Sequence, residues 1–468
     1  MQSDLSVSIS KVCQKSCAVV GLGVSNLPLV RFLCAHGAHP VVREKRSEKE
    51  LGALAGELRA LGARLLTGEN YLQDLQEEII FRSPGMRPDL PEFCRAAANG
   101  SRLTTEVEWF LELSPARTLG VTGSDGKTTT TTLTGLFLEE ERKRRKTGRV
   151  FVGGNIGKPL LPAVEEMTAS DFAVVELSSF QLQACGASPE RAAITNLSPN
   201  HLNWHTDFEE YIAAKTEIFK HERCRMLVLN ANNEKTAALA KSSPVPVTWF
   251  TKSGRPPRVQ KCVFVQNGMV VADFGNGELP ILPVADFRLP GSHNLENLFA
   301  AVALTEGLVT PASIAEVART FCGVEHRLQK VGVFGGVTYY NSSIDSTPTR
   351  TQAALSALAG QGIRPVVICG GYDKHLSYAP LAAALETYAK AAVLTGQTAG
   401  VIAEAIRANA PQFPFVTEPD FRRAVEQAKA LAQPGDTVLL SPACASFDAF
   451  QNFAERGETF CKIVRSFS

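Results

Sequence analysis

The sequence has no long hydrophobic run and almost no net charge. Its 468 residues contain no stretch of the roughly 18 to 20 apolar residues that cross a bilayer. The amino terminus also lacks a charged stretch followed by an apolar core. Lysine and arginine together number 48 and aspartate and glutamate 47, which gives a formal net charge of +1. We therefore expect a cytoplasmic protein without membrane insertion and without a nucleic-acid partner.

Paired cysteines and zinc motifs are also lacking. The 11 cysteines are odd in number and scattered, and no C-x-x-C pair occurs, so we expect reduced thiols. Cys369 and Cys444 lie in apolar runs and are expected to pack in the core. His201 and His205 could share a helix face, but the glutamate of H-E-x-x-H is absent and no third ligand is evident. Zinc is therefore disfavoured.

The overall composition is typical of a folded globular protein. Apolar residues make up 44% and charged residues 20% of the chain. The length suggests about three domains. The one dense basic cluster, ERKRRK, is interpreted as a solvated helix end.

Three times the sequence runs from an apolar strand through a glycine or polar turn into a helical pattern, the order of parallel α/β units. These patterns predict an α/β fold of three domains: a Rossmann-like domain over residues 1–107, a central P-loop ATPase-type domain with a mostly parallel sheet over 108–324, and a Rossmann-like domain over 325–468. The expected strands lie at 17–23, 40–43, 118–123, 337–340, 365–369, 391–395 and 437–441, with helices at 27–36 and 350–358.

The strongest motif is GVTGSDGKTT at residues 120–129, a strand followed by a glycine-rich turn and a helix start. Backbone N–H groups of such a loop concentrate positive potential on phosphate oxygens. Lys127 adds a charge near the β and γ phosphates, and the Thr128 hydroxyl can hold Mg²⁺. The motif predicts a bound nucleoside triphosphate but names no reaction.

A second turn, GLGVSN at residues 21–26, is weaker. Asn26 stands where a dinucleotide-binding turn has its third glycine, so an NAD-linked oxidoreductase is disfavoured. The strand that follows ends in the polar run 43–46, which is either a rim for a nucleotide's sugar or base or an ordinary exposed strand end.

Two residues downstream of the phosphate loop bear on metal binding. Glu176 ends the apolar strand in VVELSSFQL, where a carboxylate can complete a Mg²⁺ site that a loop hydroxyl begins. Lys215, in YIAAKTEIF, has apolar neighbours in a helical pattern. From these neighbours alone, it is best interpreted as a surface lysine whose stem lies along apolar residues.

Taken together, the motifs resemble the Mur ligase superfamily, which includes folylpolyglutamate synthases. The resemblance covers nearly the whole chain, in order. The closing motif LLSPACASFDAFQNFAERG, together with GNIG at residues 154–157, is similar to the branch that adds D-glutamate to UDP-N-acetylmuramoyl-L-alanine in peptidoglycan synthesis. The motifs are TGSDGKTT, ELSSFQL, NLSPNHLNWH with AAKTEIF, PGSHNLENLFAA, EHRL, YNSSIDSTPTRT, GGYDKH and LLSPACASFDAFQNFAERG.

The resemblance implies an ATP-dependent, monomeric ligase that passes through an acyl-phosphate, and it implies roles for individual residues. ATP would be bound by Gly123, Ser124, Asp125, Gly126, Lys127, Thr128, Thr129, Asn294, Asn297 and Arg327. Two Mg²⁺ ions would be held by Thr128, Glu176, His201 and a carbamylated Lys215, with Lys127, His201 and Lys215 as catalytic residues. The UDP substrate would be bound by Val24, Ser25, Glu44, Lys45, Arg46 and Asn155. D-Glutamate would be bound by Ser346, Lys374, Ser446, Phe447 and Phe453.

The sequence departs from the family pattern at three positions. Asp125 stands where asparagine is usual and adds negative charge near the triphosphate. Ser342 and Ile344 stand where an aspartate and a lysine are expected, which puts ribose and glutamate contacts there in question; Asp345 and Ser346 could replace them. The alternatives are a ligase of the same superfamily with another amino acid, and a non-catalytic ATP-binding switch.

Overall fold

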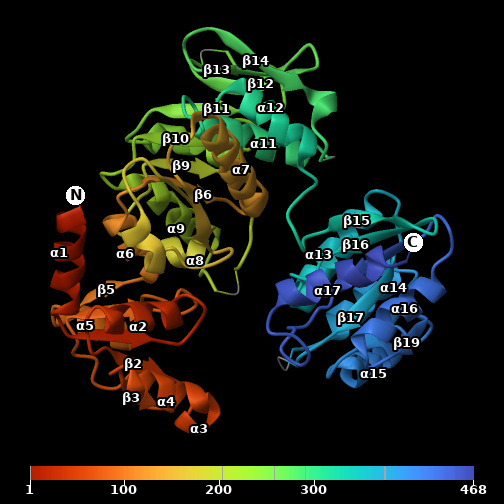
Figure 1. Ribbon diagram of the computed structural model, residues 1–468, viewed down its shortest axis with the longest axis horizontal. Helices are drawn as coiled ribbons and strands as arrows, with labels where there is room; N and C mark the ends of the chain where they lie inside the picture. The colour runs from red at the N-terminus through yellow and green to blue at the C-terminus, as the bar shows by residue number, and fades with distance from the viewer. Residues whose placement is uncertain (1, 203, 258, 290, 374–375, 468) are drawn as a thin grey trace. The chain divides into compact units, whose positions relative to one another are not determined.

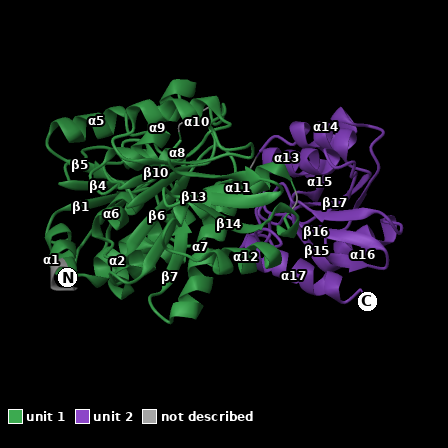
Figure 2. Cartoon of the chain, turned by 90° about the horizontal axis from the view of Figure 1, so that it is seen from above, with its two compact units in different colours: residues 1–321 green, residues 322–468 purple. Residues whose placement is uncertain are grey.

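The computed structural model describes residues 2–202, 204–257, 259–289, 291–373 and 376–467. The chain divides into two compact units, residues 1–321 and 322–468 (Figure 2). Two sheets among the described residues lie in the first unit and one in the second (Figure 1). The α/β class with mostly parallel sheets is thus confirmed, whereas the domain limits at residues 107 and 324 stay a prediction.

The first sheet is parallel throughout and has the strand order β3-β2-β1-β4-β5. Its central strand reads CAVV and is buried on both faces, as expected for a parallel strand with helices on both sides. The strands are β1 (Cys17–Val20), β2 (Val41–Glu44), β3 (Arg64–Thr67), β4 (Ile79–Arg82) and β5 (Arg102–Thr104), and the helices are α1 (Gln2–Cys13), α2 (Asn26–Ala35), α3 (Glu48–Leu51), α4 (Ala53–Ala60), α5 (Pro91–Ala98) and α6 (Glu106–Leu113).

The second sheet has the order β14-β13-β12-β11-β10-β9-β6-β8-β7, parallel from β7 to β12 and antiparallel in the hairpins that end it. Its strands are β6 (Arg117–Thr122), β7 (Val150–Gly154), β8 (Phe172–Glu176), β9 (Arg191–Ile194), β10 (Met226–Asn230), β11 (Val247–Phe250), β12 (Cys262–Gln266), β13 (Met269–Asp273) and β14 (Glu278–Pro283). Its helices are α7 (Lys127–Arg145), α8 (Ser179–Leu182), α9 (Phe208–Lys220), α10 (Glu234–Ala238), α11 (Ser292–Leu304) and α12 (Pro311–Thr320), with the short 3₁₀ turns η1 (Leu161–Glu166), η2 (Leu239–Ser242) and η3 (Val284–Asp286).

The third sheet, in the second unit, has the order β15-β16-β20-β17-β18-β19, and only the β15/β16 pair among its described strands is antiparallel. Its strands are β15 (Gln329–Phe334), β16 (Val337–Asn341), β17 (Val366–Gly370), β18 (Ala391–Thr395), β19 (Phe415–Thr417) and β20 (Thr437–Leu440). Its helices are α13 (Pro348–Ala359), α14 (Ala379–Tyr388), α15 (Ala399–Asn409), α16 (Phe421–Leu431) and α17 (Phe453–Arg465).

One hydrophobic cluster joins the first two sheets. Trp109 of α6 packs edge-on against Phe32 of α2, with ring centroids 5.8 Å apart, and against Phe81 of β4 at 5.4 Å. The same cluster continues into Ala173 and Val175 of β8. Apolar burial therefore holds the first two sheets in one unit.

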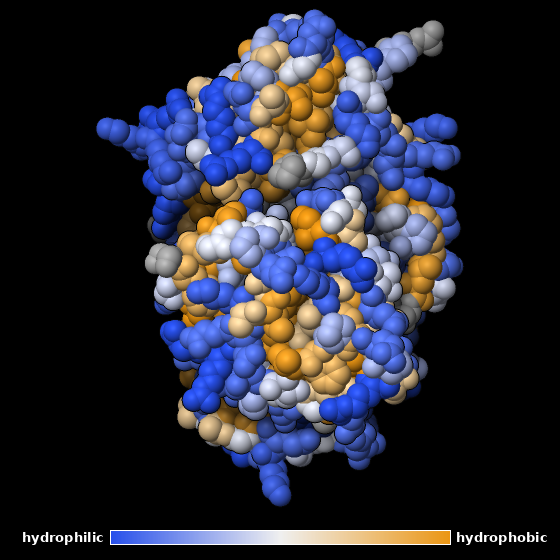
Figure 3. Space-filling model, turned by 90° about the vertical axis from the view of Figure 1, so that its right-hand side faces the viewer, coloured by the Kyte–Doolittle hydropathy of each residue, from blue (hydrophilic) through white to orange (hydrophobic). Residues whose placement is uncertain are grey.

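The mostly hydrophilic surface and the cysteines without disulfides are as expected from the composition. Hydrophilic residues cover most of the face in Figure 3, with smaller hydrophobic areas between them. None of the 11 cysteines forms a disulfide, and Cys369 and Cys444 are fully buried, as predicted. The basic run 142–145 forms the last turn of α7, where the helix dipole favours positive charge. Among the described residues, no helix is long and apolar enough to span a membrane.

A buried acid at the start of α6 makes stability depend on pH. Glu106 is 3% exposed, and burial raises the pKa of its carboxyl from 4.5 to about 7, although the backbone N–H of Leu161 donates to it at 3.1 Å. Between pH 4.5 and about 7, the Glu106 carboxyl is therefore protonated in the folded state and ionised in the unfolded state. Its stabilising contribution is present below pH 4.5 and is lost as the pH rises to about 7.

We expect Glu106→Gln to be more stable than the wild type by about 2 kcal/mol at pH 8 and to differ little at pH 4.5, because glutamine accepts the Leu161 hydrogen bond without a charge. Thermal unfolding at both pH values measures this difference, with the exposed Glu69→Gln as control. A Glu106→Gln effect that is the same at both pH values would contradict the assignment.

Candidate functional site

The phosphate loop lies between the carboxyl end of β6 and the amino end of α7, and its glycines are required by shape. Gly123 has φ 147° and Gly126 has φ 78°, values that favour glycine. A Cβ on Gly123 would lie 1.9 Å from Thr195 Oγ1, and one on Gly126 would lie 2.0 Å from Asn297 Oδ1. The loop is thus closely surrounded on both sides.

Two residues after β9 hold the loop in place. The backbone N–H of Asp125 donates to Asn196 Oδ1 at 3.0 Å, and Thr195 Oγ1 donates to the Asp125 carbonyl at 2.6 Å. Lys127 Nζ donates to the carbonyls of Gly123 and Ser124 at 2.9 and 2.8 Å. Lys127 therefore folds over the loop, beside the α7 amino terminus, which suits bound phosphate.

Glu176, at the carboxyl end of β8, has one satisfied and one unsatisfied oxygen. It is 1% exposed, and Asn155 Nδ2 donates to its Oε1 at 2.7 Å. Its buried Oε2 has no hydrogen-bond partner among the described residues. A buried carboxylate oxygen without a partner is costly unless a cation binds it, so the residue fits a magnesium ligand.

Lys215 lies on α9 and is buried, so its interpretation as a surface lysine is wrong. It is 1% exposed; its Nζ donates to Thr122 Oγ1 at 3.1 Å and lies 4.7 Å from the centre of the Tyr211 ring. Burial, and secondarily the charge of Lys127, holds the pKa of Lys215 well below its usual range. An uncharged amine is nucleophilic, and an added carboxylate group would turn it into a metal ligand.

His201 and His205 do not share a helix, because the described residues between β9 and α9 form loop and turn structure and His201 has φ 55°. Phe180 of α8 packs against both rings, at centroid distances of 4.9 Å to His201 and 5.9 Å to His205. His205 is buried and its Nε2 contacts Ser179 Oγ at 3.0 Å. His201 is exposed, so only His201 is open to a ligand.

Three of the predicted metal ligands come together at one edge of the second sheet. Thr128 follows β6, Glu176 ends β8, and Lys215 contacts the last residue of β6. Because β6 lies between β8 and β9, this edge is the switch point where open α/β sheets bind ligands. No group of three or more His, Cys, Asp or Glu side chains forms a ready metal site in the described ranges.

Two asparagines predicted to bind ATP lie together at the start of α11. Asn297 Nδ2 donates to Asn294 Oδ1 at 3.4 Å, and Asn297 borders the phosphate loop, as the Gly126 contact shows. Arg327 is exposed and belongs to the second unit.

The first sheet forms a second polar edge beyond β1 and β2. Val24 is 80% exposed, and Ser25, which precedes α2, is half-buried. Glu44 accepts from the Leu22 N–H at 2.7 Å and from Arg46 Nε at 3.1 Å. Burial opposes ionisation of Glu44, but these hydrogen bonds outweigh it and lower its pKa.

Two further residues complete this edge. Lys45 is exposed beside Arg46. Asn26, which replaces the third glycine of a dinucleotide turn, donates to the Val20 and Gly21 carbonyls at 3.0 and 2.9 Å. The Asn26 side chain thereby fixes the turn itself.

In the second unit the predicted amino-acid site lies around the loop after β20. Phe447 is 65% exposed and faces Tyr372 at a ring distance of 6.1 Å, and Phe453 is 39% exposed. Ser446 is buried and Ser346 is half-buried. Lys374 lies outside the described residues.

A buried arginine of α17 holds this loop. Arg456 is 2% exposed and donates to the Cys444 and Ala445 carbonyls at 3.1 and 2.9 Å, and to the Ser343 carbonyl and hydroxyl. Asp345 accepts from Ser441 Oγ at 2.8 Å, and burial raises the pKa of Asp345 to about 6. The loops after β16 and β20 are thereby joined.

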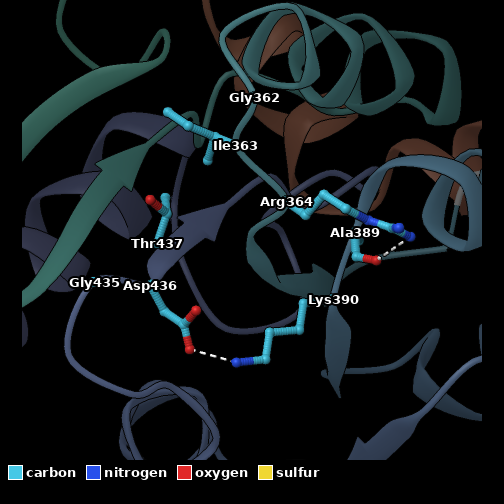
Figure 4. Close-up of a pocket in the computed structure, with 8 residues that line it drawn as sticks. All are labelled: Gly362, Ile363, Arg364, Ala389, Lys390, Gly435, Asp436 and Thr437. Carbon is cyan, nitrogen blue, oxygen red and sulfur yellow. Dashed lines mark hydrogen bonds and ion pairs between the residues drawn. The ribbon is translucent and has the colours of Figure 1, made fainter.

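A pocket of about 640 Å³ lies at the opposite, amino ends of the strands of the third sheet (Figure 4). Its charges are already paired: Lys390 Nζ lies 2.5 Å from Asp436, and Arg364 donates to the carbonyls of Glu386 and Ala389 at 3.1 Å. None of the predicted site residues in the described ranges lines this pocket.

Sequence reasoning missed the residues that brace the site. Thr195 and Asn196 hold the phosphate loop, and Tyr211 donates to Ser124 Oγ at 3.0 Å. Only their positions gave a signal: Asn196 opens the NLSPNHLNWH motif, and Tyr211 lies one helical turn before Lys215.

The unpaired oxygen of Glu176 leads to a direct prediction. We expect Glu176→Gln to weaken binding of ATP in the presence of Mg²⁺ by roughly tenfold or more, because the amide keeps the Asn155 contact but lacks the charge. Calorimetric titration with and without Mg²⁺ measures the change, and binding without Mg²⁺ should be nearly unaltered. Equal losses in both titrations would mean that Glu176 only supports the loop.

Comparison with known families gives three matches along the chain. Residues 15–105 match the Mur ligase MurD-like N-terminal domain, residues 121–305 the Mur ligase middle domain, and residues 326–444 the Mur ligase glutamate ligase domain.

Curated relatives match over nearly the full length. A protein of Clostridium novyi named UDP-N-acetylmuramoylalanine–D-glutamate ligase is 42% identical over 459 residues, 97% of each chain. One of Symbiobacterium thermophilum with the same name is 43% identical over 460 residues, 97% of this chain and 99% of the relative. The solved UDP-N-acetylmuramate-alanine ligase of Thermotoga maritima shares the fold, with a TM-score of 0.53 and 18% identity over 97% of this chain and all of that one.

Proposed function

The chain belongs to the Mur ligase family, and we propose that it joins D-glutamate to UDP-N-acetylmuramoyl-L-alanine, with ATP, in peptidoglycan precursor synthesis. The observation that carries this proposal is the gathering of Lys127, Glu176 and Lys215 at one edge of the second sheet. The same edge in a simple ATP switch would need no buried amine beside its phosphate loop. We expect the ligase to act in the cytoplasm and as a monomer.

The first half of the reaction activates the alanyl carboxylate. One carboxylate oxygen attacks the γ-phosphorus of ATP, the bond to the ADP oxygen breaks, and an acyl-phosphate forms. Lys127 and the α7 amino terminus offset the negative charge on the phosphoryl oxygens. Thr128 and Glu176 would hold one Mg²⁺, and His201 with a carbamylated Lys215 a second; Mg²⁺ supplies further charge neutralisation.

The second half forms the amide bond. The D-glutamate amine attacks the acyl carbon, loses a proton, and phosphate leaves. In the second unit, Ser446 and Ser346 supply polar groups, Phe447 and Phe453 border the amino acid, and Lys374 is proposed for a carboxylate. Arg327, Asn294 and Asn297 would bind the nucleoside part of ATP.

The UDP substrate would bind at the edge of the first sheet. Val24 and Ser25 lie at the start of α2, where a diphosphate can accept from backbone N–H groups. Glu44, Lys45 and Arg46 would face the uridine, and Asn155, next to Glu176, the sugar-peptide.

The reaction is tested by phosphate release with ATP, Mg²⁺ and UDP-N-acetylmuramoyl-L-alanine, adding D-glutamate, L-glutamate, L-lysine or meso-diaminopimelate in turn. We expect turnover with D-glutamate only, and a product heavier by one glutamyl unit. Turnover with another amino acid would keep the ligase class but reassign the second unit. Hydrolysis that ignores every amino acid would instead favour an ATP switch.

Carbamylation of Lys215 has its own test. Lys215→Ala should lose most activity, and short-chain carboxylic acids should restore part of it because they can replace the carbamate oxygens. Activity is measured against acid concentration, with Lys220→Ala, an exposed lysine on the same helix, as control. Rescue by amines rather than acids would contradict a carbamate.

A further inference from the structure

An arginine of the first sheet contacts the helix that carries Lys215. Arg87 lies in the loop after β4, and Glu210 lies in the first turn of α9. Arg87 Nη1 donates to Glu210 Oε2 at 3.1 Å and Nη2 to Oε1 at 2.7 Å, so the two side chains pair through two parallel bonds. Arg87 Nη1 also donates to the Trp204 carbonyl at 2.7 Å, and its guanidinium lies 5.4 Å from the Trp204 ring centre.

On one side, this pair leads to the proposed diphosphate loop, residues 21–25. The backbone N–H of Ser83 donates to the Val20 carbonyl at 2.9 Å. A Cβ on Gly21 would lie 3.2 Å from Ser83 Cβ, so the turn 83–86 packs against that loop. Trp204 Nε1 donates back to the Gly85 carbonyl at 3.2 Å. The turn before Arg87 therefore contacts both sheets.

On the other side, Glu210 organises the segment that holds His201. Its carboxylate accepts from the Thr206 N–H at 2.7 Å and from Gln183 Nε2 at 3.1 Å. His205 Nδ1 lies 3.5 Å from the same carboxylate. Lys215 follows Glu210 on the same helix, so a shift of Glu210 would move two proposed metal ligands.

The charges of the pair are stable at working pH. The side chains of Arg87 and Glu210 are 22% and 23% exposed, so water screens them less than a surface pair. Hydrogen bonds from Arg87, more than any other contact, lower the pKa of Glu210 to about 2. Both groups therefore stay ionised.

We propose that Arg87 is a positioning residue of the ligase, which fixes the UDP-substrate loop and the metal-binding helix in one arrangement so that the two ligands bind cooperatively. The inference rests on the proposed function, because it takes UDP-N-acetylmuramoyl-L-alanine as the ligand of the first sheet. In this role Arg87 and Glu210 act through the backbone of residues 83–86 and of α9, not on a reacting group.

The test measures the affinity for UDP-N-acetylmuramoyl-L-alanine by calorimetry, with and without a saturating non-hydrolysable ATP analogue and Mg²⁺. In the wild type we expect the analogue to tighten binding by roughly fivefold or more. In Arg87→Ala and in Glu210→Gln, the analogue should change the affinity for the UDP substrate by no more than about twofold. The double variant should lose no more than either single variant, because each removes the charge-assisted pairing of Arg87 with Glu210.

Two controls separate this role from general support. Arg95→Ala removes an exposed arginine that pairs with Glu92 within helix α5, and should keep the wild-type factor. Arg87→Lys keeps the charge but not the paired bonds, and should retain an intermediate factor. A merely structural role would lower the melting temperature and both single-ligand affinities while leaving the factor unchanged.

The outcomes distinguish this inference from the proposed function. If the ATP analogue does not change the affinity of the wild type for the UDP substrate, or if it changes the affinity of the variants as much as that of the wild type, the role of Arg87 alone is overturned. A wild type that does not bind the UDP substrate would overturn both.

Discussion

The burial of Lys215 is the constraint on which the rest of the site depends. A lysine at 1% exposure, beside the charge of Lys127, cannot keep its ammonium form without a large cost in free energy. The amine must be neutral or carry a group that binds metal. Glu176, with its unpaired buried oxygen, has the complementary need for a cation. Metal and phosphate bound at the edge between the two residues would satisfy both requirements.

The sheet order explains how distant segments meet at this edge. Strand β6 lies between β8 and β9, so the phosphate loop, Glu176 and the bracing residues Thr195 and Asn196 all emerge at the same end. The first sheet presents its own polar edge after β1 and β2. A single hydrophobic cluster and the Arg87–Glu210 pair join both sheets within the first unit.

The sequence predicted whatever depends on neighbouring residues. The strand expected at 17–23 is present over 17–20, the strand expected at 391–395 is present over those residues, and the phosphate loop follows β6; all three are local patterns. Burial of Lys215 was missed because helical periodicity does not tell how deeply a face is covered. The four-residue spacing of His201 and His205, which would suit a shared helix face, does not reflect a helix, since His201 adopts a left-handed backbone conformation. The Arg87–Glu210 pair joins residues 123 positions apart, which no local pattern reveals.

The central claim is that ATP activates the alanyl carboxylate before the amine attacks. The most direct test uses UDP-N-acetylmuramoyl-L-alanine labelled with ¹⁸O in that carboxylate and follows the label by mass spectrometry of the products. Because an acyl-phosphate leaves one carboxylate oxygen on the phosphorus, we predict that each released phosphate carries one labelled oxygen while ADP carries none. Phosphate without label, formed together with the amide, would contradict the account.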